Sequence, residues 1–93
     1  MKPKILVAGL LPRQSQRIEK RIGKAARLVF WNKEESQHSL TTRAMNADVC
    51  ILAVNFLAHQ DTECAKKGAK KIVRAAGGMG SIEDEIWNQI RGA

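Results

Sequence analysis

The stretch DVCILAV, Asp48 to Val54, carries the strongest strand signal in the sequence. From Val49 onward it is apolar throughout, without the polar alternation of a half-exposed strand. A short continuous apolar run of this kind is typical of a strand whose two faces are both covered. The same run is far too short to span a membrane. It therefore predicts a central strand with helices packed on both sides.

The segments on either side of this strand alternate in the same way. Short apolar or branched segments predict strands, and segments with apolar residues every three or four positions predict helices. We predict strands at residues 4–9, 27–31, 48–54 and 71–75. We predict helices at residues 13–26, 59–67 and 82–91, and a short helix that is capped by Ser39 and ends at residue 45. Strict alternation with right-handed crossovers gives a small doubly wound parallel sheet, a Rossmann-like or flavodoxin-like α/β fold in strand order 2-1-3-4.

Length and charge limit what this fold can do. Ninety-three residues form one domain, 1–93, and a chain this short leaves homodimer formation open as an added source of stability. The net charge of +7 favours nucleic acid, acidic proteins or small phosphate-like anions as partners, against the alternative of a solvated basic surface. Without a signal peptide or membrane span we expect a cytoplasmic protein, with no membrane partner and with Cys50 as a core thiol rather than half of a disulfide.

The first predicted helix carries the most informative charge pattern. Its cations recur at helical spacing and form one basic stripe beside the apolar face. Packing does not explain five cations that repel one another, so we interpret them as a surface for a polyanion or an acidic partner. The helix has no aromatic residue, which disfavours recognition of single-stranded bases there. The stripe comprises Arg13, Arg17, Lys20, Arg21 and Lys24.

A second candidate site is the crevice at the carboxyl ends of the strands, where doubly wound sheets bind ligands. The start of the first helix could hold a small anion through backbone amides and the helix dipole. Gly9 is the only glycine there, so a dinucleotide fingerprint is absent, and a plain strand–helix connection is the alternative. The candidate anion-binding and ligand-binding residues are Arg13, Gln14, Ser15, Asn55, His59, Arg74, Gly80 and Ser81.

Catalysis is the weaker interpretation of this crevice. His59 follows the third strand and could act as a general base, but no Ser/His/acid set accompanies it. We therefore assign no catalytic residue. Two His and two scattered Cys lack metal-ligand spacing, so we predict no metal and no cofactor.

The stretch RAAGGMGSIEDEIW, residues 74–87, has the outline of a phosphate loop before a helix. Ser81 and Asp84 predict a capping box, which places three carboxylates in the first turn. Those carboxylates would repel a phosphate. We therefore expect this loop to form a wall of the crevice, with Arg74 as a contact.

The second half of the chain resembles a known family. NADVCILAVNFLAH (46–59), a basic KKGAKK segment (66–71), a strand and GMGS (78–81) are similar to domain-of-unknown-function family number 2325, small Rossmann-like proteins of bacteria and their phages. The matched positions are Ala47-Asp48, His59 and Gly80-Ser81. The chain departs from the family at Ala58, where a Ser is usual, and in its shorter third helix. The resemblance implies the fold and no settled activity.

Two functions follow from these observations. The first is a small non-enzymatic binding or regulatory module whose basic first helix recognises nucleic acid, a nucleotide-like anion or an acidic protein. The alternative is a small enzyme or nucleotide-binding protein that uses the crevice through Arg13, Asn55, His59 and Ser81.

Overall fold

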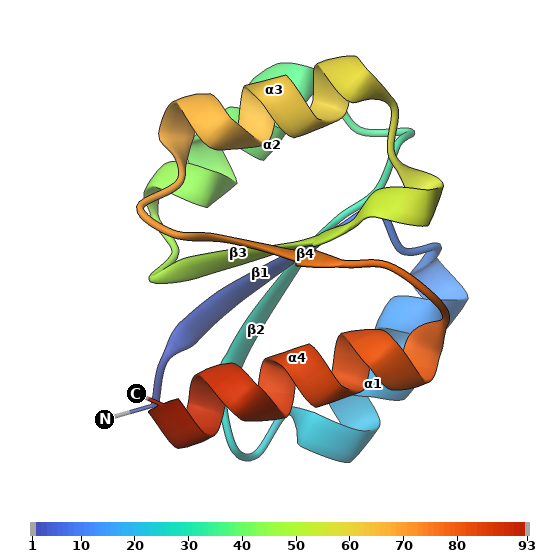
Figure 1. Cartoon of the computed structure of the whole chain (residues 1–93), viewed down its shortest axis with the longest axis vertical. Helices are drawn as coiled ribbons and strands as arrows, with labels where there is room; N and C mark the ends of the chain where they lie inside the picture. The colour runs from blue at the N-terminus through green and yellow to red at the C-terminus, as the bar shows by residue number, and fades with distance from the viewer. Residues whose placement is uncertain (1, 93) are drawn as a thin grey trace.

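The computed structural model describes residues 2–92 and contains one four-stranded sheet with four α-helices (Figure 1). All strand pairs are parallel, and the order β2-β1-β3-β4 confirms the doubly wound fold predicted from the sequence. The elements are β1 (Lys4–Ala8), α1 (Pro12–Ile22), β2 (Arg27–Trp31), α2 (Gln37–Met45), β3 (Val49–Ala53), the short 3-10 helix η1 (Val54–Phe56), α3 (His59–Gly68), β4 (Ile72–Ala75) and α4 (Met79–Gly92).

The sheet separates two hydrophobic layers. Figure 1 shows α2 and α3 on one face of the sheet and α1 and α4 on the other. Successive residues of a strand point to opposite faces, so Ile5 and Val7 pack with the α1/α4 layer, whereas Leu6 and Ala8 pack with the α2/α3 layer. Every residue of β3 is buried, as the apolar sequence of residues 49–54 predicts.

Two helix boundaries differ from the sequence prediction. Helix α1 ends at Ile22, with Gly23 as its C-cap, so Lys24 lies in the turn that follows and not on the helix. Helix α2 begins at Gln37, because the Ser36 hydroxyl accepts a hydrogen bond from the backbone N–H of Ser39 at 3.1 Å. The prediction of Ser39 as the cap was wrong because two serines three positions apart compete for this role, and Ser36 takes it.

The predicted capping box of the fourth helix was also wrong. Helix α4 begins at Met79, two residues before Ser81, and its first turn contains no acidic residue. The Ser81 hydroxyl donates to the carbonyl of Ala76 at 3.0 Å and so closes the loop before the helix. The carboxylates of residues 83–85 thus lie in the second turn, where they act less directly on the N-terminal amides.

One outward-facing carbonyl on the outer edge of β2 is hydrogen-bonded by a side chain. In a parallel strand the backbone groups of alternate residues face the same neighbour, and the Trp31 carbonyl accepts from Gly9 of the β1 side. The Phe30 carbonyl therefore points away from the sheet. Arg43 of α2 donates to it from Nη1 at 2.8 Å, while its Nη2 lies 2.6 Å from the Glu35 carboxylate.

The two cysteines are both free. Cys50 lies within buried β3, and its burial raises the pKa of its thiol to about 12, as expected of a core thiol. Between residues 2 and 92, no helix combines the length and the apolar character needed to cross a bilayer.

Candidate nucleic-acid interface

A shallow pocket lies at the carboxyl edge of the sheet, above β1. Its volume is about 240 Å³. Gly9 forms its floor with a φ of +113°, and a Cβ there would lie 3.0 Å from Leu57 Cγ and 3.2 Å from the Ala53 carbonyl oxygen. Glycine adopts this conformation without the strain that a side chain would introduce here. The pocket is lined by Gly9, Leu10, Leu11, Pro12, Asn32, Lys33, Glu34 and Phe56.

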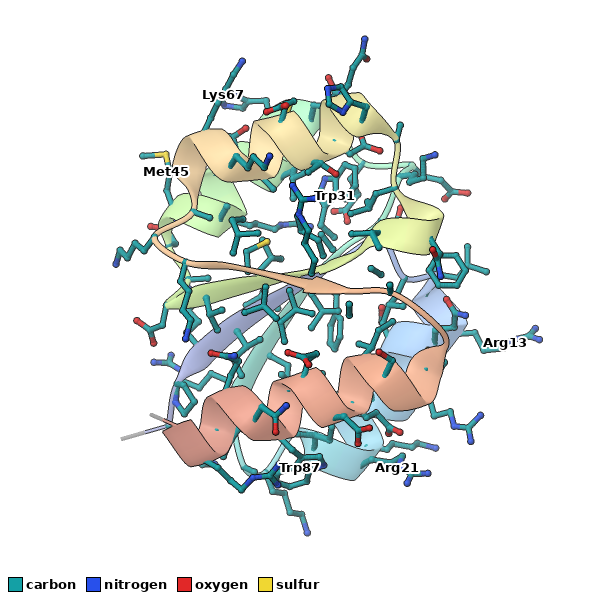
Figure 2. All side chains as sticks on the ribbon, in the orientation of Figure 1. Arg13, Arg21, Trp31, Met45, Lys67 and Trp87 are labelled. Carbon is teal, nitrogen blue, oxygen red and sulfur yellow. The ribbon has the colours of Figure 1, made fainter. Side chains whose placement is uncertain are left out.

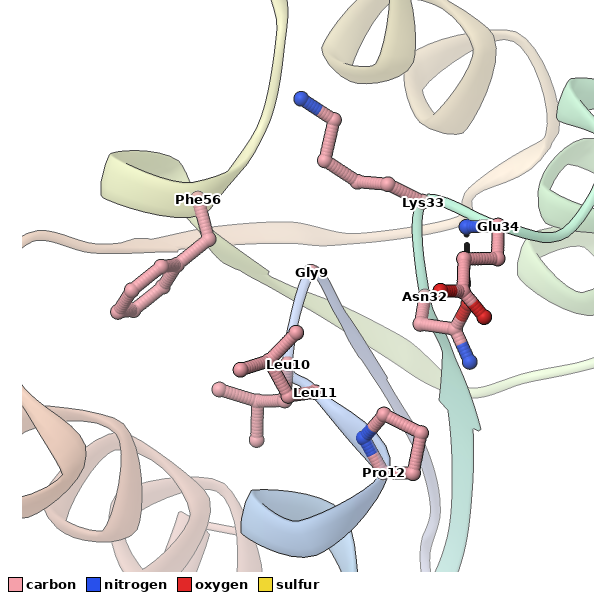
Figure 3. A pocket seen from close by; sticks show the side chains of 8 residues that line it. All are labelled: Gly9, Leu10, Leu11, Pro12, Asn32, Lys33, Glu34 and Phe56. Carbon is pink, nitrogen blue, oxygen red and sulfur yellow. Dashed lines mark hydrogen bonds between the residues drawn. The ribbon is translucent and has the colours of Figure 1, made fainter.

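The two sides of this pocket differ in character. Figure 3 shows Phe56 of η1 facing Leu11, and both are exposed for large apolar side chains, at 37% and 63%. The opposite side comes from the turn after β2, where the Asn32 carboxamide oxygen accepts from the backbone N–H of Glu34 at 2.9 Å. Lys33 extends from this turn toward the Phe56 side. The pocket thus combines an apolar wall with a polar, charged one.

Helix α1 presents a row of cations to solvent. It buries Ser15, Ile18 and Ile22 against the sheet. At 100° per residue, the opposite side of the helix is occupied by three cations within about 60° of one another. We call this the basic face; it consists of Arg13, Arg17 and Lys20, all exposed and none in a salt bridge within the described chain.

Arg21 lies on the flank of α1 and behaves differently. Its Nε is 2.9 Å from the Glu83 carboxylate of α4, so its charge is already matched within the protein. The predicted stripe of five cations therefore divides into a basic face of three, one paired residue, and Lys24 in the turn beyond the helix.

The start of α1 offers fewer free amides than the sequence indicated. The Gln14 carboxamide oxygen accepts from the backbone N–H of Leu11 at 2.9 Å, and Pro12 has no N–H. Ser15 is buried on the sheet side, and its own N–H bonds to the Leu11 carbonyl. Arg13 projects outward (Figure 2), whereas Gln14 is half-buried and Ser15 is buried.

Two other candidates hold the neighbouring loops in place. The Asn55 side-chain amide donates to the Gly77 carbonyl at 3.4 Å, which ties η1 to the loop after β4. Ser81 bonds within that loop, and Gly80 lies in the first turn of α4 with open space around it. None of these residues lines the pocket.

His59 and Arg74 lie outside the pocket as well. The His59 side chain is 85% exposed, and its Nε2 is 3.5 Å from the carboxylate of Glu63, one turn further along α3. Arg74 is paired in register with Leu52, so it faces the α3 side of the edge strand β4. Asn55 and Ser81 therefore meet at the loop around Gly77, and none of the candidate crevice residues lines the pocket.

No metal centre is evident in the described residues: within 2–92, no group of three or more His, Cys, Asp or Glu side chains is placed to hold an ion. A scan with protein-family models matches no family, and no curated protein matches the chain in sequence. The resemblance to family 2325 stays a prediction.

Two apolar residues of the pocket, Leu11 and Phe56, are not among the residues predicted from the sequence. Neither is Lys33, which lies beside them. A signal was available, because LLP follows the first strand and NFL follows the third, and both loops reach the carboxyl edge of a doubly wound sheet. Charged and polar side chains are the usual indication of an anion site in a sequence, and apolar residues in loops do not give this indication.

Proposed function

We propose that this protein is a small binding module that holds the phosphate backbone of a nucleic acid on the basic face of α1. The observation that supports the proposal is the orientation of that face. Its three cations lie opposite the buried side of the helix and form no salt bridge with any residue between 2 and 92, whereas Arg21 and Arg43 are each paired with a carboxylate.

The spacing of the basic face suits a phosphate chain. Arg13 and Lys20 are about 10 Å apart along the helix axis at 1.5 Å per residue. A B-form duplex rises about 3.4 Å per nucleotide along its axis, so an α-helix lying parallel to that axis would extend its basic face over roughly three nucleotide steps. Two of the three residues are arginines, whose guanidinium groups bind phosphate oxygens in a bidentate manner.

Salt-dependent binding to duplex DNA tests this proposal. Neutralising about three phosphates gives a slope of log affinity against log salt near −2.7. Replacing Arg17 and Lys20 by Gln should lower the affinity and reduce the slope by about two. The matched control replaces Lys66 and Lys67, two exposed cations in the last turn of α3 on the other face (Figure 2), and should leave the slope nearly unchanged.

Three outcomes would contradict the proposal. If the wild-type protein binds no nucleic acid at low salt, the function is wrong. If both double variants lose affinity equally, net charge and not the basic face governs binding. If polyglutamate competes as well as DNA at equal charge, the surface is one for acidic proteins.

A further inference from the structure

We propose that the pocket above β1 receives one unpaired base of a single-stranded nucleic acid whose phosphates lie along the basic face. This inference rests on the proposed function and specifies its substrate as single-stranded. It brings together two features that are far apart in the sequence, the apolar side chain of Phe56 and the cations of α1.

The pocket adjoins the basic face at the start of α1. Pro12 lines the pocket and is the first residue of α1, and Arg13, the first cation of the basic face, follows it directly. A strand bound along the helix from Lys20 to Arg13 therefore arrives at the pocket. Unpaired bases of such a strand are free to turn into it, whereas the bases of a duplex are stacked and paired.

The apolar wall has the properties of a stacking surface. Aromatic side chains that bind single strands present a ring face to one base, and this contact is tolerant of sequence. Phe56 and Leu11 both line the apolar side of the pocket and are exposed, so two large apolar groups border one opening. Its 3-10 helix is anchored by the hydrogen bond from Asn55 to Gly77 and by the bond from the Leu57 N–H to the Val54 carbonyl.

Size and charge favour a base over other occupants. A volume of about 240 Å³ lies below the usual range for drug-sized ligands, roughly 300–1,000 Å³, so a dinucleotide does not fit. The Glu34 carboxylate beside the pocket disfavours a phosphate inside it. A neutral base avoids this repulsion, and Lys33 on the same side supplies a cation for the phosphate that adjoins the base.

The test compares an oligothymidylate of about ten nucleotides with an abasic strand of the same length, which keeps the phosphates and lacks the bases. The wild-type protein should bind the oligothymidylate about 5- to 100-fold more tightly than the abasic strand. Phe56→Ala should remove this difference and leave binding to the abasic strand and to duplex DNA unchanged. Phe56→Trp should keep it, with quenching of the new indole on binding.

The matched control is Met45→Ala, which removes another exposed apolar side chain, at the end of α2 and remote from Arg13 (Figure 2). It should preserve the preference for the base-bearing strand. Circular dichroism checks that each variant is folded. Should Phe56→Ala fail to fold, the wild-type ratio of the two affinities still decides, since a ratio near one overturns the inference.

The remaining outcomes separate this inference from the proposed function. Suppose that the wild-type protein binds the oligothymidylate and the abasic strand equally, and that replacing Arg17 and Lys20 weakens binding to each. The inference of a base pocket is then wrong, and the proposed function stands. Absence of binding to any strand at low salt overturns the proposed function itself. If Phe56→Ala converts a dimer to a monomer in sedimentation without altering the strand preference, the pocket is a contact between copies of the chain, and the inference is wrong.

Discussion

Arg21 of α1 and Glu83 of α4 are joined by an ion pair of 2.9 Å between Nε and Oε1. The pair links the two helices that cover the same face of the sheet. It also divides the cations of α1 into one that is paired within the protein and three that form no salt bridge among residues 2–92.

Replacing Arg21 by Gln should therefore have a small effect on stability and little effect on binding. The Arg21 side chain is largely exposed, so we expect its loss to lower the free energy of unfolding by less than about 1 kcal/mol. Glu83→Gln frees Arg21 and should strengthen duplex binding, with the salt slope steeper by up to about one. Urea unfolding and salt titrations measure both effects. A loss of affinity in Arg21→Gln as large as in Arg17→Gln would extend the basic face to the α4 side.

Two glycines should respond to alanine in opposite directions. Gly9→Ala forces a side chain into a positive-φ conformation and against Leu57 and Ala53, so we expect a loss of about 1–3 kcal/mol or more. Gly80→Ala adds a methyl group to α4 with no atom within 4 Å, and we expect a gain of about 0.5–1 kcal/mol.

Chemical unfolding of these two variants provides the measurement. The pair is matched, because each changes one hydrogen to a methyl group in a loop or helix end at the same edge of the sheet. A neutral Gly9→Ala would mean that the turn after β1 relaxes easily, which the close contacts of its Cβ position argue against.

The pair between Glu35 and Arg43 should make stability depend on pH. The hydrogen bond from the Arg43 guanidinium holds the pKa of Glu35 below its ordinary value of 4.5. Since the carboxyl binds its proton more weakly in the folded state, the pair stabilises the fold above pH 4.5. This contribution, at most about 1 kcal/mol for a partly exposed pair, is lost as the pH falls through the lowered pKa.

Glu35→Gln is the informative variant, because the carboxamide oxygen can still accept the bond from the Asn32 N–H. Its free energy of unfolding should be lower than that of the wild type at neutral pH, and the two should converge in acid. Parallel curves across this range would show that the ion pair does not contribute to stability.

The arrangement of the elements was predictable from the sequence because β3 is apolar throughout and the other three strands are mostly apolar. DVCILAV alone implies cover on both faces, and the alternation of segments around it gives the strand order. Helix ends were less predictable, since they depend on which of several serines reaches a free amide. Ser36 and Ser39 both satisfy the pattern of a cap, and the geometry of the turn after β2 selects Ser36.

The candidate site was predicted in part. The row Arg13, Arg17 and Lys20 follows from helical spacing, so its location on one side of α1 could be foreseen. The pairing of Arg21 with Glu83 could not, because it depends on two helices, distant in the sequence, lying on the same face of the sheet. The same holds for Phe56, which lines one pocket with Leu11 because β1 and β3, the strands that precede them, lie side by side.

The bond from Arg43 to the Phe30 carbonyl has a consequence for self-association. Edge strands are templates for further strands, and RLVFW is rich in the branched and aromatic residues that favour such growth. Arg43 occupies an outward-facing acceptor that an incoming strand would need and places a charge beside it. A single guanidinium, held in place by Glu35, thus disfavours the addition of a further strand at this edge of the sheet.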